Sequence, residues 1–274
     1  MKDLKGKVAV ITGAGSGIGR SLAGVLAAEG AHLALSDVNE ATLRETVEGL
    51  SKGDVKVTSH RLDVADRAAV HAHADEVLAA HGQVDIVINN AGVAVVQNIE
   101  DVSYEDFEWV MGINFWGVVY GTKAFLPHLK TRPEASIVNI SSVNAFLPFP
   151  FNGPYNCSKY AVCGFSETLH QELAETKVRV SSVHPGGIKT NIAKNARMHV
   201  AEGGDVEQME RGRQNLEKAF LTSPEKAAGQ ILRAVQMNSR RALIGPDAHV
   251  FNALARLPAA AYQRLVGLGA RRTM

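Results

Sequence analysis

Residues 7–19 carry the sequence KVAVITGAGSGIG, and this stretch decides the fold. Lys7–Thr12 is an apolar, β-branched run, which predicts a strand covered on both faces. The glycines after it allow a tight turn into a helix that starts at Gly17. At such a turn the backbone can approach a pyrophosphate, whose charge the positive end of the helix stabilises. An ordinary strand-to-helix turn is the alternative interpretation.

The alternation of strand and helix continues to residue 244. Further strands are expected at 31–36, 55–60, 84–89, 135–141, 178–183 and 241–244. Helices are expected at 17–29, 39–50, 68–81, 103–128, 155–175 and 224–237. This order predicts an α/β fold, a Rossmann-type doubly wound parallel sheet of about seven strands with helices on both faces. Residues 1–246 are expected to form a single domain.

Two regions interrupt this alternation. Residues 188–222 form a long polar insertion with several glycines, which is typical of a lid over a substrate. Residues 247–274 form a C-terminal extension that combines apolar side chains with four arginines. The extension could pack on a neighbouring subunit, cover the cleft or lie on an acidic membrane surface, and subunit packing is the favoured interpretation.

Composition excludes several classes of protein. The 274 residues include 29 Lys and Arg against 28 Asp and Glu, a net charge of +1, which argues against a nucleic-acid partner. No stretch approaches the roughly 18 apolar residues of a spanning helix, so no membrane-spanning segment is expected. Cys157 and Cys163 are too far apart along one helix for a disulfide. We therefore expect a cytoplasmic protein with reduced cysteines.

Asp37 ends the second predicted strand, 18 positions after Gly19. A carboxylate there can accept hydrogen bonds from the adenosine ribose hydroxyls of a dinucleotide. It would also repel a 2′-phosphate, and no arginine stands directly beside it in the sequence, so NAD is favoured over NADP. A helix cap before Asn39 is the alternative role for Asp37.

Three further motifs follow later strands. They are Asn89-Asn90-Ala91-Gly92, Tyr155-Asn156-Cys157-Ser158-Lys159 and Pro185-Gly186. With the TGxxxGxG of Thr12–Gly19 they resemble the short-chain dehydrogenase/reductase family in its single-domain form of about 250 residues. The resemblance spans residues 5 to about 246. It implies NAD as cofactor, hydride transfer to or from a small alcohol or carbonyl substrate, and a homotetramer.

Tyr155 and Lys159 are four residues apart at the start of a predicted helix and share one face. Lowering a phenol pKa by about 3 units takes roughly 4 kcal/mol, which the lysine ammonium together with the positive nicotinamide could supply by stabilising the phenolate. The resemblance implies that Tyr155 exchanges a proton with the substrate oxygen and that Lys159 also holds the nicotinamide ribose. An exposed Tyr/Lys pair without function is the alternative.

Two other residues complete the predicted catalytic set. The family's serine usually lies 13 residues before the tyrosine, which selects Ser142 to polarise the substrate oxygen. Ser141 is a weaker candidate because its side chain should point to the other side of the strand. Asn114 is implied to hold a water in a proton relay, often at a local helix kink. A helix asparagine bonded to its own backbone is the alternative.

The other predicted cofactor contacts come from four turns after strands. They are Gly13, Ser16, Gly17, Ile18, Gly19, Asp63, Val64, Asn90, Ala91, Gly92, Pro185, Gly186, Ile188 and Thr190. Asp63 is about equally consistent with a capping role, and Asn90 could also brace the fourth and fifth strands. Ile188 and Thr190 are expected to hold the nicotinamide carboxamide.

The expected substrate contacts are Ser142, Asn144, Phe149, Tyr155 and Gly187. Their neighbours in the expected cleft, among them Val95, Val143 and Ala145, are apolar and aromatic. This favours a hydrophobic secondary alcohol or ketone, with steroids, retinoids, fatty acyl derivatives and small diketones all open. No metal site is expected, since His71 and His73 face different directions on a helix. His184, beside Pro185, is interpreted as a buried structural residue.

Two other functions fit the same motifs. A non-catalytic module that responds to NAD(H) would need Asp37 and the glycines but would have no use for Tyr155. A dehydratase or epimerase on the same fold would show no net change in NADH.

Overall fold

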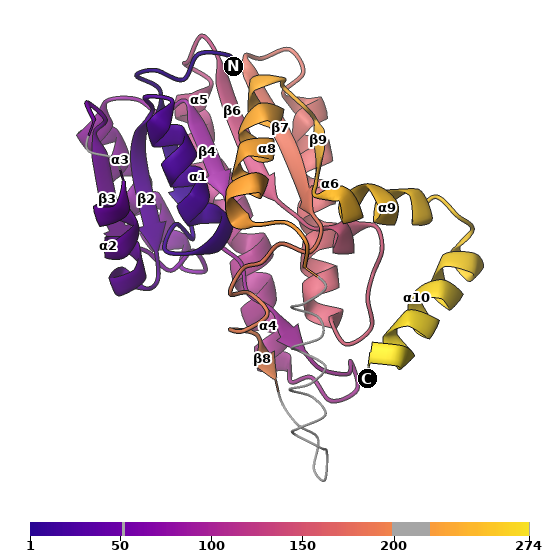
Figure 1. Ribbon diagram of the computed structural model, residues 1–274. Coiled ribbons are helices and arrows are strands. Elements are labelled where there is room, and N and C mark those ends of the chain that lie inside the picture. Colours follow the sequence, from indigo (N-terminus) through magenta and orange to yellow (C-terminus); the bar gives the residue numbers. More distant parts are fainter. Residues whose placement is uncertain (51–52, 199–219, 274) are drawn as a thin grey trace.

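The chain forms one large parallel sheet with helices on both faces (Figure 1). The computed structural model describes residues 1–50, 53–198 and 220–273. Within them the seven-stranded sheet has the order β3-β2-β1-β4-β6-β7-β9, and every neighbouring pair is parallel. Its strands are β1 (Val8–Thr12), β2 (His32–Asp37), β3 (Val57–Arg61), β4 (Ile86–Asn89), β6 (Ala135–Ile140), β7 (Val178–Pro185) and β9 (Arg241–Ile244). The predicted Rossmann-type fold is confirmed.

The strand order reverses between β1 and β4. Chain connections leave β1 toward β2 on one side, and β4 continues toward β6 on the other. In an open parallel sheet ligands bind beyond the carboxyl ends of the strands at such a switch point. The turns after β1 and β4 are therefore the first place to look for a site.

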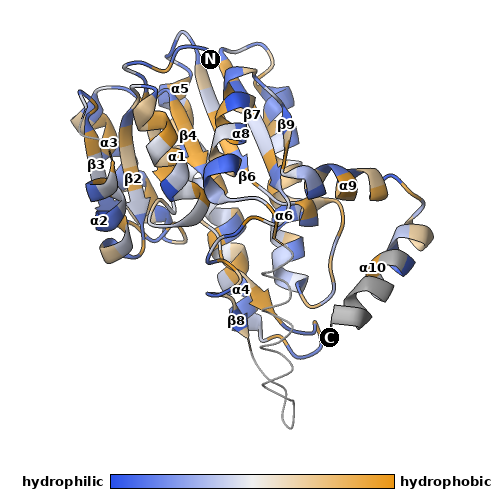
Figure 2. Cartoon of the chain, viewed as in Figure 1, coloured by the Kyte–Doolittle hydropathy of each residue, from blue (hydrophilic) through white to orange (hydrophobic). Residues whose placement is uncertain are grey.

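Helices cover the sheet in two layers (Figure 1). Buried side chains of α1, α2 and α8 pack in one core, and those of α3, α5 and α6 pack in the other. The bounds are α1 (Gly17–Ala28), α2 (Glu40–Gly49), α3 (Arg67–His81), α5 (Gly117–Leu129), α6 (Gly153–Glu172) and α8 (Pro224–Gln236). Every residue of β1 and β6 is buried, and the central strands are mainly hydrophobic in Figure 2. Burial on both faces explains why these strands are nearly continuous apolar runs.

One predicted helix is interrupted. The sequence predicted a single helix over 103–128, whereas the structure has α4 (Tyr104–Met111), a π-helical turn η1 (Gly112–Trp116) and then α5. A π turn adds a residue to the helical repeat and is often found at functional sites. Asn114 lies in this turn, so the helix is irregular at the place where the resemblance implied a kink.

The region 188–222 is described only at its two ends. The Thr222 N–H donates to the Gly187 carbonyl and the Thr222 carbonyl accepts from the Lys189 N–H, on either side of Ile188. A short strand β8 (Arg197–Met198) pairs with β5 (Val95–Val96). The Arg197 guanidinium stacks on the Trp109 ring at 3.6 Å and lies 2.7 Å from the Asp106 carboxylate of α4. The rest of the predicted lid, 199–219, lies outside the described residues.

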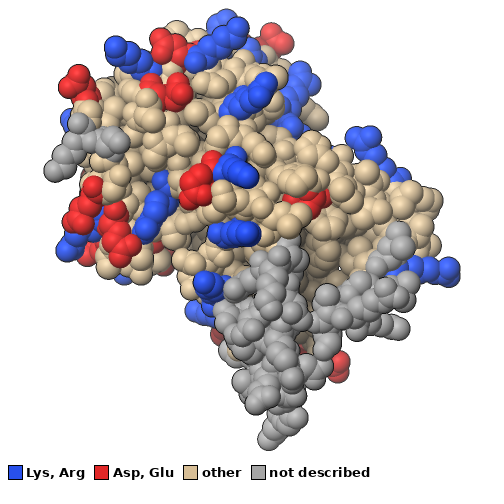
Figure 3. All heavy atoms as spheres, in the orientation of Figure 1, with Lys and Arg blue, Asp and Glu red and all other residues tan. Residues whose placement is uncertain are grey.

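The C-terminal extension forms two helices, α9 (Pro246–Leu254) and α10 (Ala259–Thr273), which project from the body next to α6 (Figure 1). Within the described residues, none of the helices combines the length and hydropathy needed to cross a bilayer. On the face seen in Figure 3, acidic and basic side chains are interspersed. Cys157 is exposed and Cys163 is buried, both on α6 and neither in a disulfide.

Candidate active site

The turn between β1 and α1 forms a cradle for an anion. Gly13 and Gly17 have φ values of 65° and 51°, which favour glycine. A Cβ on Gly13 would lie 2.8 Å from the Ala91 backbone, and one on Gly17 would lie 3.0 Å from Thr190. Side chains are thus excluded at Gly13 and Gly17, where the turn touches the loops after β4 and β7.

The amino end of α1 has no capping side chain. Ser16 occupies the N-cap position without a side-chain hydrogen bond, and the first turn holds no acidic residue. By contrast α2, α3, α4 and α8 are each capped by an oxygen, from Asn39, Asp66, Ser103 and Ser223. Free N–H groups and the helix dipole fit a bound phosphate, so the predicted group of Gly13, Ser16, Gly17, Ile18 and Gly19 suits a pyrophosphate.

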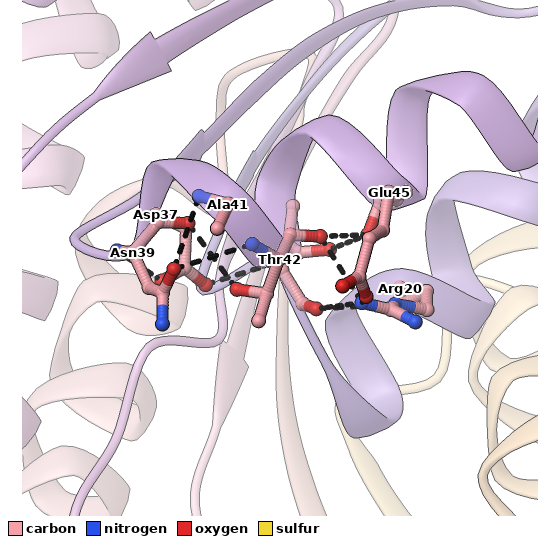
Figure 4. Close-up of polar contacts among 9 residues, drawn as sticks. Arg20, Asp37, Asn39, Ala41, Thr42 and Glu45 are labelled. Atoms are coloured by element: carbon pink, nitrogen blue, oxygen red, sulfur yellow. Dashed lines mark hydrogen bonds and ion pairs between the residues drawn. The ribbon is translucent and has the colours of Figure 1, made fainter.

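Asp37 is fixed beside this turn by two backbone donors (Figure 4). Its Oδ2 accepts from the Gly15 N–H at 2.8 Å and its Oδ1 from the Asn39 N–H at 2.9 Å. Asn39, not Asp37, caps α2. The nearby Arg20 guanidinium is held by Glu45 at 2.9 Å and by backbone carbonyls of Gly15 and Thr42. Asp37 therefore presents a fixed carboxylate, and the arginine closest to the turn is already paired.

Asn90 ties the turn after β4 to the turn after β1. Its Nδ2 donates to the Thr12 carbonyl at 2.9 Å and to the Gly13 carbonyl at 3.1 Å. In return the Thr12 hydroxyl oxygen accepts from the Asn90 and Ala91 N–H groups. The predicted bracing of β4 against β6 belongs instead to Asn89, which donates to Asn139 at 2.8 Å. Asn90 thus holds the backbone of the glycine turn in place through hydrogen bonds from the turn after β4.

Asp63 and Val64, which the sequence predicts at the adenine edge, make structural contacts in the fold. Asp63 accepts from the Ala65 N–H at 2.9 Å, and the cap of α3 is Asp66. Val64 is buried against Gly117, where a Cβ would come within 2.8 Å of it. The predicted capping role of Asp63 is replaced by a turn that directs the chain from β3 into α3.

Tyr155 and Lys159 lie together at the start of α6, as predicted. The Lys159 Nζ is 5.4 Å from the centroid of the Tyr155 ring and donates to the Ile140 carbonyl at 2.9 Å. Lys159 is only 3% exposed, and burial lowers its pKa to about 8. At neutral pH it is therefore still mainly a cation, held at the carboxyl end of β6.

The expected lowering of the Tyr155 pKa is not found in the protein alone. Burial raises the pKa of the phenol above its ordinary value near 10, and a side-chain hydrogen bond with Ser142 only partly opposes this. Desolvation of the phenolate is the largest cause of this shift, and the Lys159 Nζ, beside the ring, is directed to the Ile140 carbonyl. The predicted lowering relied on Lys159 together with a positive nicotinamide, so it stays a prediction for the protein with its dinucleotide bound.

Ser142 and Ser141 have different partners. The Ser142 hydroxyl donates to Asn144 Oδ1 at 3.1 Å and accepts from the Asn144 N–H, at the start of the short helix η2 (Val143–Ala145). Ser141 donates to the backbone carbonyl of Lys159 at 2.9 Å and is buried. The preference for Ser142 is consistent with this geometry, because Ser141 is committed to the packing of α6 on β6.

Asn114 is fully buried, and its side chain is occupied by neighbours. Its Oδ1 accepts from the Val93 N–H at 2.8 Å, and its Nδ2 donates to the Val93 carbonyl and the Ser158 hydroxyl. Both amide hydrogens are therefore used. The side chain fixes the Gly92–Val93 backbone against α6, so any water in a relay would have to bind elsewhere on this residue.

The turn after β7 reaches across the cradle. Pro185 ends β7, and the Gly186 N–H donates to Ile244 of β9 at 3.0 Å. Ile188 is 4% exposed and belongs to the core, whereas Thr190 lies over Gly17. Two predicted ends of the dinucleotide site, the phosphate turn and the nicotinamide turn, are thereby brought together.

Comparison with known proteins identifies this arrangement. The short chain dehydrogenase family model matches residues 7–201. The chain belongs to that family. A Mycobacterium tuberculosis protein named as the oxidoreductase SadH is 46% identical over 98% of this chain and 97% of its own. Dehydrogenase/reductase SDR family member 7B of Xenopus laevis is 35% identical over 88% of this chain and 74% of its own.

Solved structures of the short-chain dehydrogenase family agree. One from Burkholderia phymatum, in complex with NAD, has a TM-score of 0.86 and 33% identity over 94% of both chains. Another from Mycobacterium paratuberculosis, also bound to NAD, has a TM-score of 0.77 and 28% identity over 88% of this chain and 97% of that one.

The predicted substrate contacts and their apolar neighbours differ in burial. Asn144, Phe149 and Gly187 are partly buried, and Phe149 contacts Phe251 of α9 with ring centroids 5.4 Å apart. Other apolar neighbours that the sequence placed in the cleft are in the core, where Val95, Val143 and Ala145 are less than 5% exposed. Apolar sequence alone could not separate these two environments.

Sequence reasoning missed two features of this short-chain dehydrogenase site. Phe151 has a φ of 64°, four residues before Tyr155, and its carbonyl accepts from Gln97 at 2.8 Å. A positive φ at a bulky residue is strained, by about 1–3 kcal/mol. Asp247, at the start of α9, accepts from the Gly187 N–H at 2.6 Å. No sequence pattern indicates the strained backbone of Phe151. Asp247, by contrast, could have been noticed as the acidic residue directly after Gly245-Pro246.

The histidines are arranged differently from expectation. His73 lies with His60 of β3 and Glu76 of α3, and one ligand atom from each falls within 4.8 Å of the others. His60 Nδ1 is 3.1 Å from Glu76 Oε2, while His73 is 3% exposed, edge-on to Phe125. Burial, aided by His60, lowers the His73 pKa to about 4. The pairing of His71 with His73 did not identify this neighbourhood; the absence of a metal stays a prediction.

His184 is completely buried, as predicted for a structural residue. Its ring nitrogens lie 3.0 Å from the Ser182 hydroxyl and 3.1 Å from the Ser142 carbonyl, and Phe146 packs on its ring. Burial lowers its pKa to about 4. His184 thereby braces the backbone of Ser142 from beneath the site.

Proposed function

We propose that the protein is an NAD-dependent oxidoreductase that transfers hydride between nicotinamide and a hydrophobic secondary alcohol or ketone. The observation that best supports this is the grouping of Tyr155, Lys159 and Ser142 at the carboxyl ends of the sheet, beside the glycine cradle. A protein that only sensed the dinucleotide would need the cradle alone. Membership of the short-chain dehydrogenase family supports the same reaction class.

The residues of the cradle suit NAD better than NADP. The uncapped start of α1 would hold the pyrophosphate, and Asp37 would accept from the adenosine ribose hydroxyls. A 2′-phosphate would meet that carboxylate, while Arg20 is engaged by Glu45. NAD-bound structures among the neighbours support this choice. When bound, NAD supplies the hydride acceptor or donor.

The side chains then handle the proton and the substrate oxygen. Tyr155 takes the hydroxyl proton when an alcohol is oxidised and returns it when a ketone is reduced. Ser142 donates a hydrogen bond to the same oxygen after turning from Asn144. Lys159 is the nearby cation whose charge favours the phenolate when proton transfer occurs. Because burial raises the phenol pKa, a positive nicotinamide must contribute to this activation as well.

Absorbance of NADH tests the proposal with a panel of secondary alcohols and ketones graded by size and polarity. Tyr155→Phe should lower turnover at least about 100-fold, the lower end of acid-base contributions, with the Kd for NAD changed less than a few-fold. Tyr160→Phe is the matched control, because Tyr160 is 43% exposed on the same helix.

Each outcome distinguishes among functions. Unchanged turnover in Tyr155→Phe would remove the proposed mechanism. NAD binding without any absorbance change would favour the sensing module, and product formation without net NADH change would favour dehydration or epimerisation. Preference for NADP would contradict the role of Asp37. We also propose, as separate expectations, a homotetramer and a cytoplasmic location.

A further inference from the structure

Helix α9, the first element of the C-terminal extension, touches both sides of the proposed substrate space. Asp247 and Phe251 are four residues apart, so their side chains share one face of the helix. Asp247 contacts the turn after β7, and Phe251 contacts the loop that precedes α6. These two segments carry Gly187 and Phe149, two of the predicted substrate contacts.

The Asp247 carboxylate is built into the turn. Its Oδ2 accepts from the Gly187 N–H at 2.6 Å, and its Oδ1 is buried without a hydrogen-bond partner among the described residues. A Cβ on Gly186 would collide with this carboxylate, and one on Gly245 would lie 2.7 Å from its Oδ1. Gly186 therefore leaves room for Asp247, a reason for this glycine that is separate from cofactor binding.

Such a bond fixes the backbone of the turn. A hydrogen bond from an N–H to a carboxylate is about twice as strong as one between neutral groups. The neighbouring Gly186 N–H is bonded to Ile244 at 3.0 Å, so consecutive amides are held by β9 and by α9. The path of the chain toward Ile188 and Thr190 is set by this pair of bonds.

The contact between Phe251 and Phe149 connects α9 to the loop that precedes α6. The rings of Phe251 and Phe149 meet edge to face at 5.4 Å and 77°. The Phe149 carbonyl accepts from Asn156 at 2.8 Å, and Asn156 in turn accepts from Asn144, the partner of Ser142. The position of Phe149 is thereby connected by hydrogen bonds to the Ser142 hydroxyl.

The extension also approaches the helix that carries Tyr155. Burial raises the pKa of Tyr160 on α6, and the nearby Tyr262 of α10 adds to this effect. Tyr262, near the start of α10, therefore lies close enough to α6 to affect Tyr160.

We propose that α9 is part of the active site, with Asp247 as a positioning residue for the turn 185–187 and Phe251 as a specificity-determining residue. Asp247 holds the Gly187 amide so that the nicotinamide side of the cleft keeps its shape. Phe251, packed on Phe149, bounds the space for an apolar substrate and limits its size. This inference rests on the proposed oxidoreductase function.

The Asp247 part is tested in the free protein by hydrogen exchange. Mass spectrometry of peptides spanning 183–190 should show about 10-fold or faster exchange of the Gly187 amide in Asp247→Ala, the loss expected for a bond to a charged acceptor. Asp247→Asn keeps an oxygen acceptor and should restore most of the protection. In the full enzyme, Asp247→Ala should raise the KM for NAD about 10-fold, and Asp247→Asn should recover most of it.

The Phe251 part is tested by substrate size. Phe251→Ala should increase kcat/KM for the bulkiest substrate relative to the smallest by about 5-fold or more, whereas Phe251→Leu should shift this ratio less. His249→Ala is the control on the same helix. Because His249 is exposed, this variant should leave the ratio of kcat/KM values unchanged.

The outcomes separate this inference from the proposed function. If the wild-type protein oxidises no alcohol and reduces no ketone, the proposed function fails. If it is active but Asp247→Ala leaves both exchange and the KM for NAD unchanged, the positioning role is wrong. Unaltered size preference in Phe251→Ala would overturn the specificity role. Equal effects of His249→Ala would show a general disturbance of α9 and would overturn both roles.

Discussion

Acid should destabilise the protein through His73, and the structure sets the size of the effect. Burial lowers the pKa of His73 from its ordinary 6.5 to about 4. The unfolded chain therefore binds a proton at this site below pH 6.5, while the folded chain stays neutral until about pH 4. The contribution to stability is complete above pH 6.5 and is lost as pH falls toward 4.

The magnitude follows from the shift. A difference of about 2.5 pKa units corresponds to about 3 kcal/mol in full, and to about 2 kcal/mol at pH 5. Protein stabilities are typically about 5–15 kcal/mol, so this one residue matters. His184 has the same direction and a pKa of about 4, and it should add a similar loss.

Urea unfolding at pH 7.5, 6 and 5 measures the effect. His73→Leu removes the titrating group, so its stability should fall about 2 kcal/mol less than that of the wild type between pH 7.5 and 5. His71→Ala, an exposed position on the same helix, should follow the wild type. The reasoning is refuted if wild type and His73→Leu lose equal stability over this range, because His184 acts in both.

Two other predictions concern the cradle. Asn90→Ala removes donors to the carbonyls of Thr12 and Gly13, and should lower the free energy of unfolding by about 2 kcal/mol. A larger loss is expected for Asn90→Asp, because it sets a carboxylate against those carbonyls. Unchanged thermal unfolding of both variants would contradict the role of Asn90 in holding the two turns together. Asp37→Ser should raise the KM for NAD about 10-fold and reduce discrimination against NADP by at least about 10-fold. The discrimination is measured as the ratio of kcat/KM with each cofactor. If it is retained in the variant, another group rejects the 2′-phosphate.

Local sequence predicted most of the sheet because each central strand is buried on both faces. A run such as Val8–Thr12 is short, apolar and rich in β-branched residues, and the glycines after it stop the strand at a definite place. The two-stranded β5-β8 ladder was missed because it contains only two residues on each side. Such a ladder depends on a partner about a hundred residues away, which no local pattern contains.

Motif spacing predicted the residues of the site better than their interactions. Tyr155 and Lys159 share a helix face because they are one turn apart, so their proximity required only the helix. The direction in which the Tyr155 pKa shifts depends on how much water the folded chain removes from the phenol. That quantity is a sum over neighbours from several elements, and sequence spacing contains no measure of it.

By itself, then, the order of residues determined the parallel sheet, the glycine turn before α1, and the positions of Asp37, Ser142, Tyr155 and Lys159 after particular strands. Only the tertiary structure decided that the hydrogen bonds of the Asn114 side chain go to Val93 and Ser158, and that Asp247 reaches back to Gly187. The physical reason is range. Apolar periodicity and glycine turns act between residues close in the chain, whereas burial and the hydrogen bonds that compensate for it join atoms that meet only when the chain has folded.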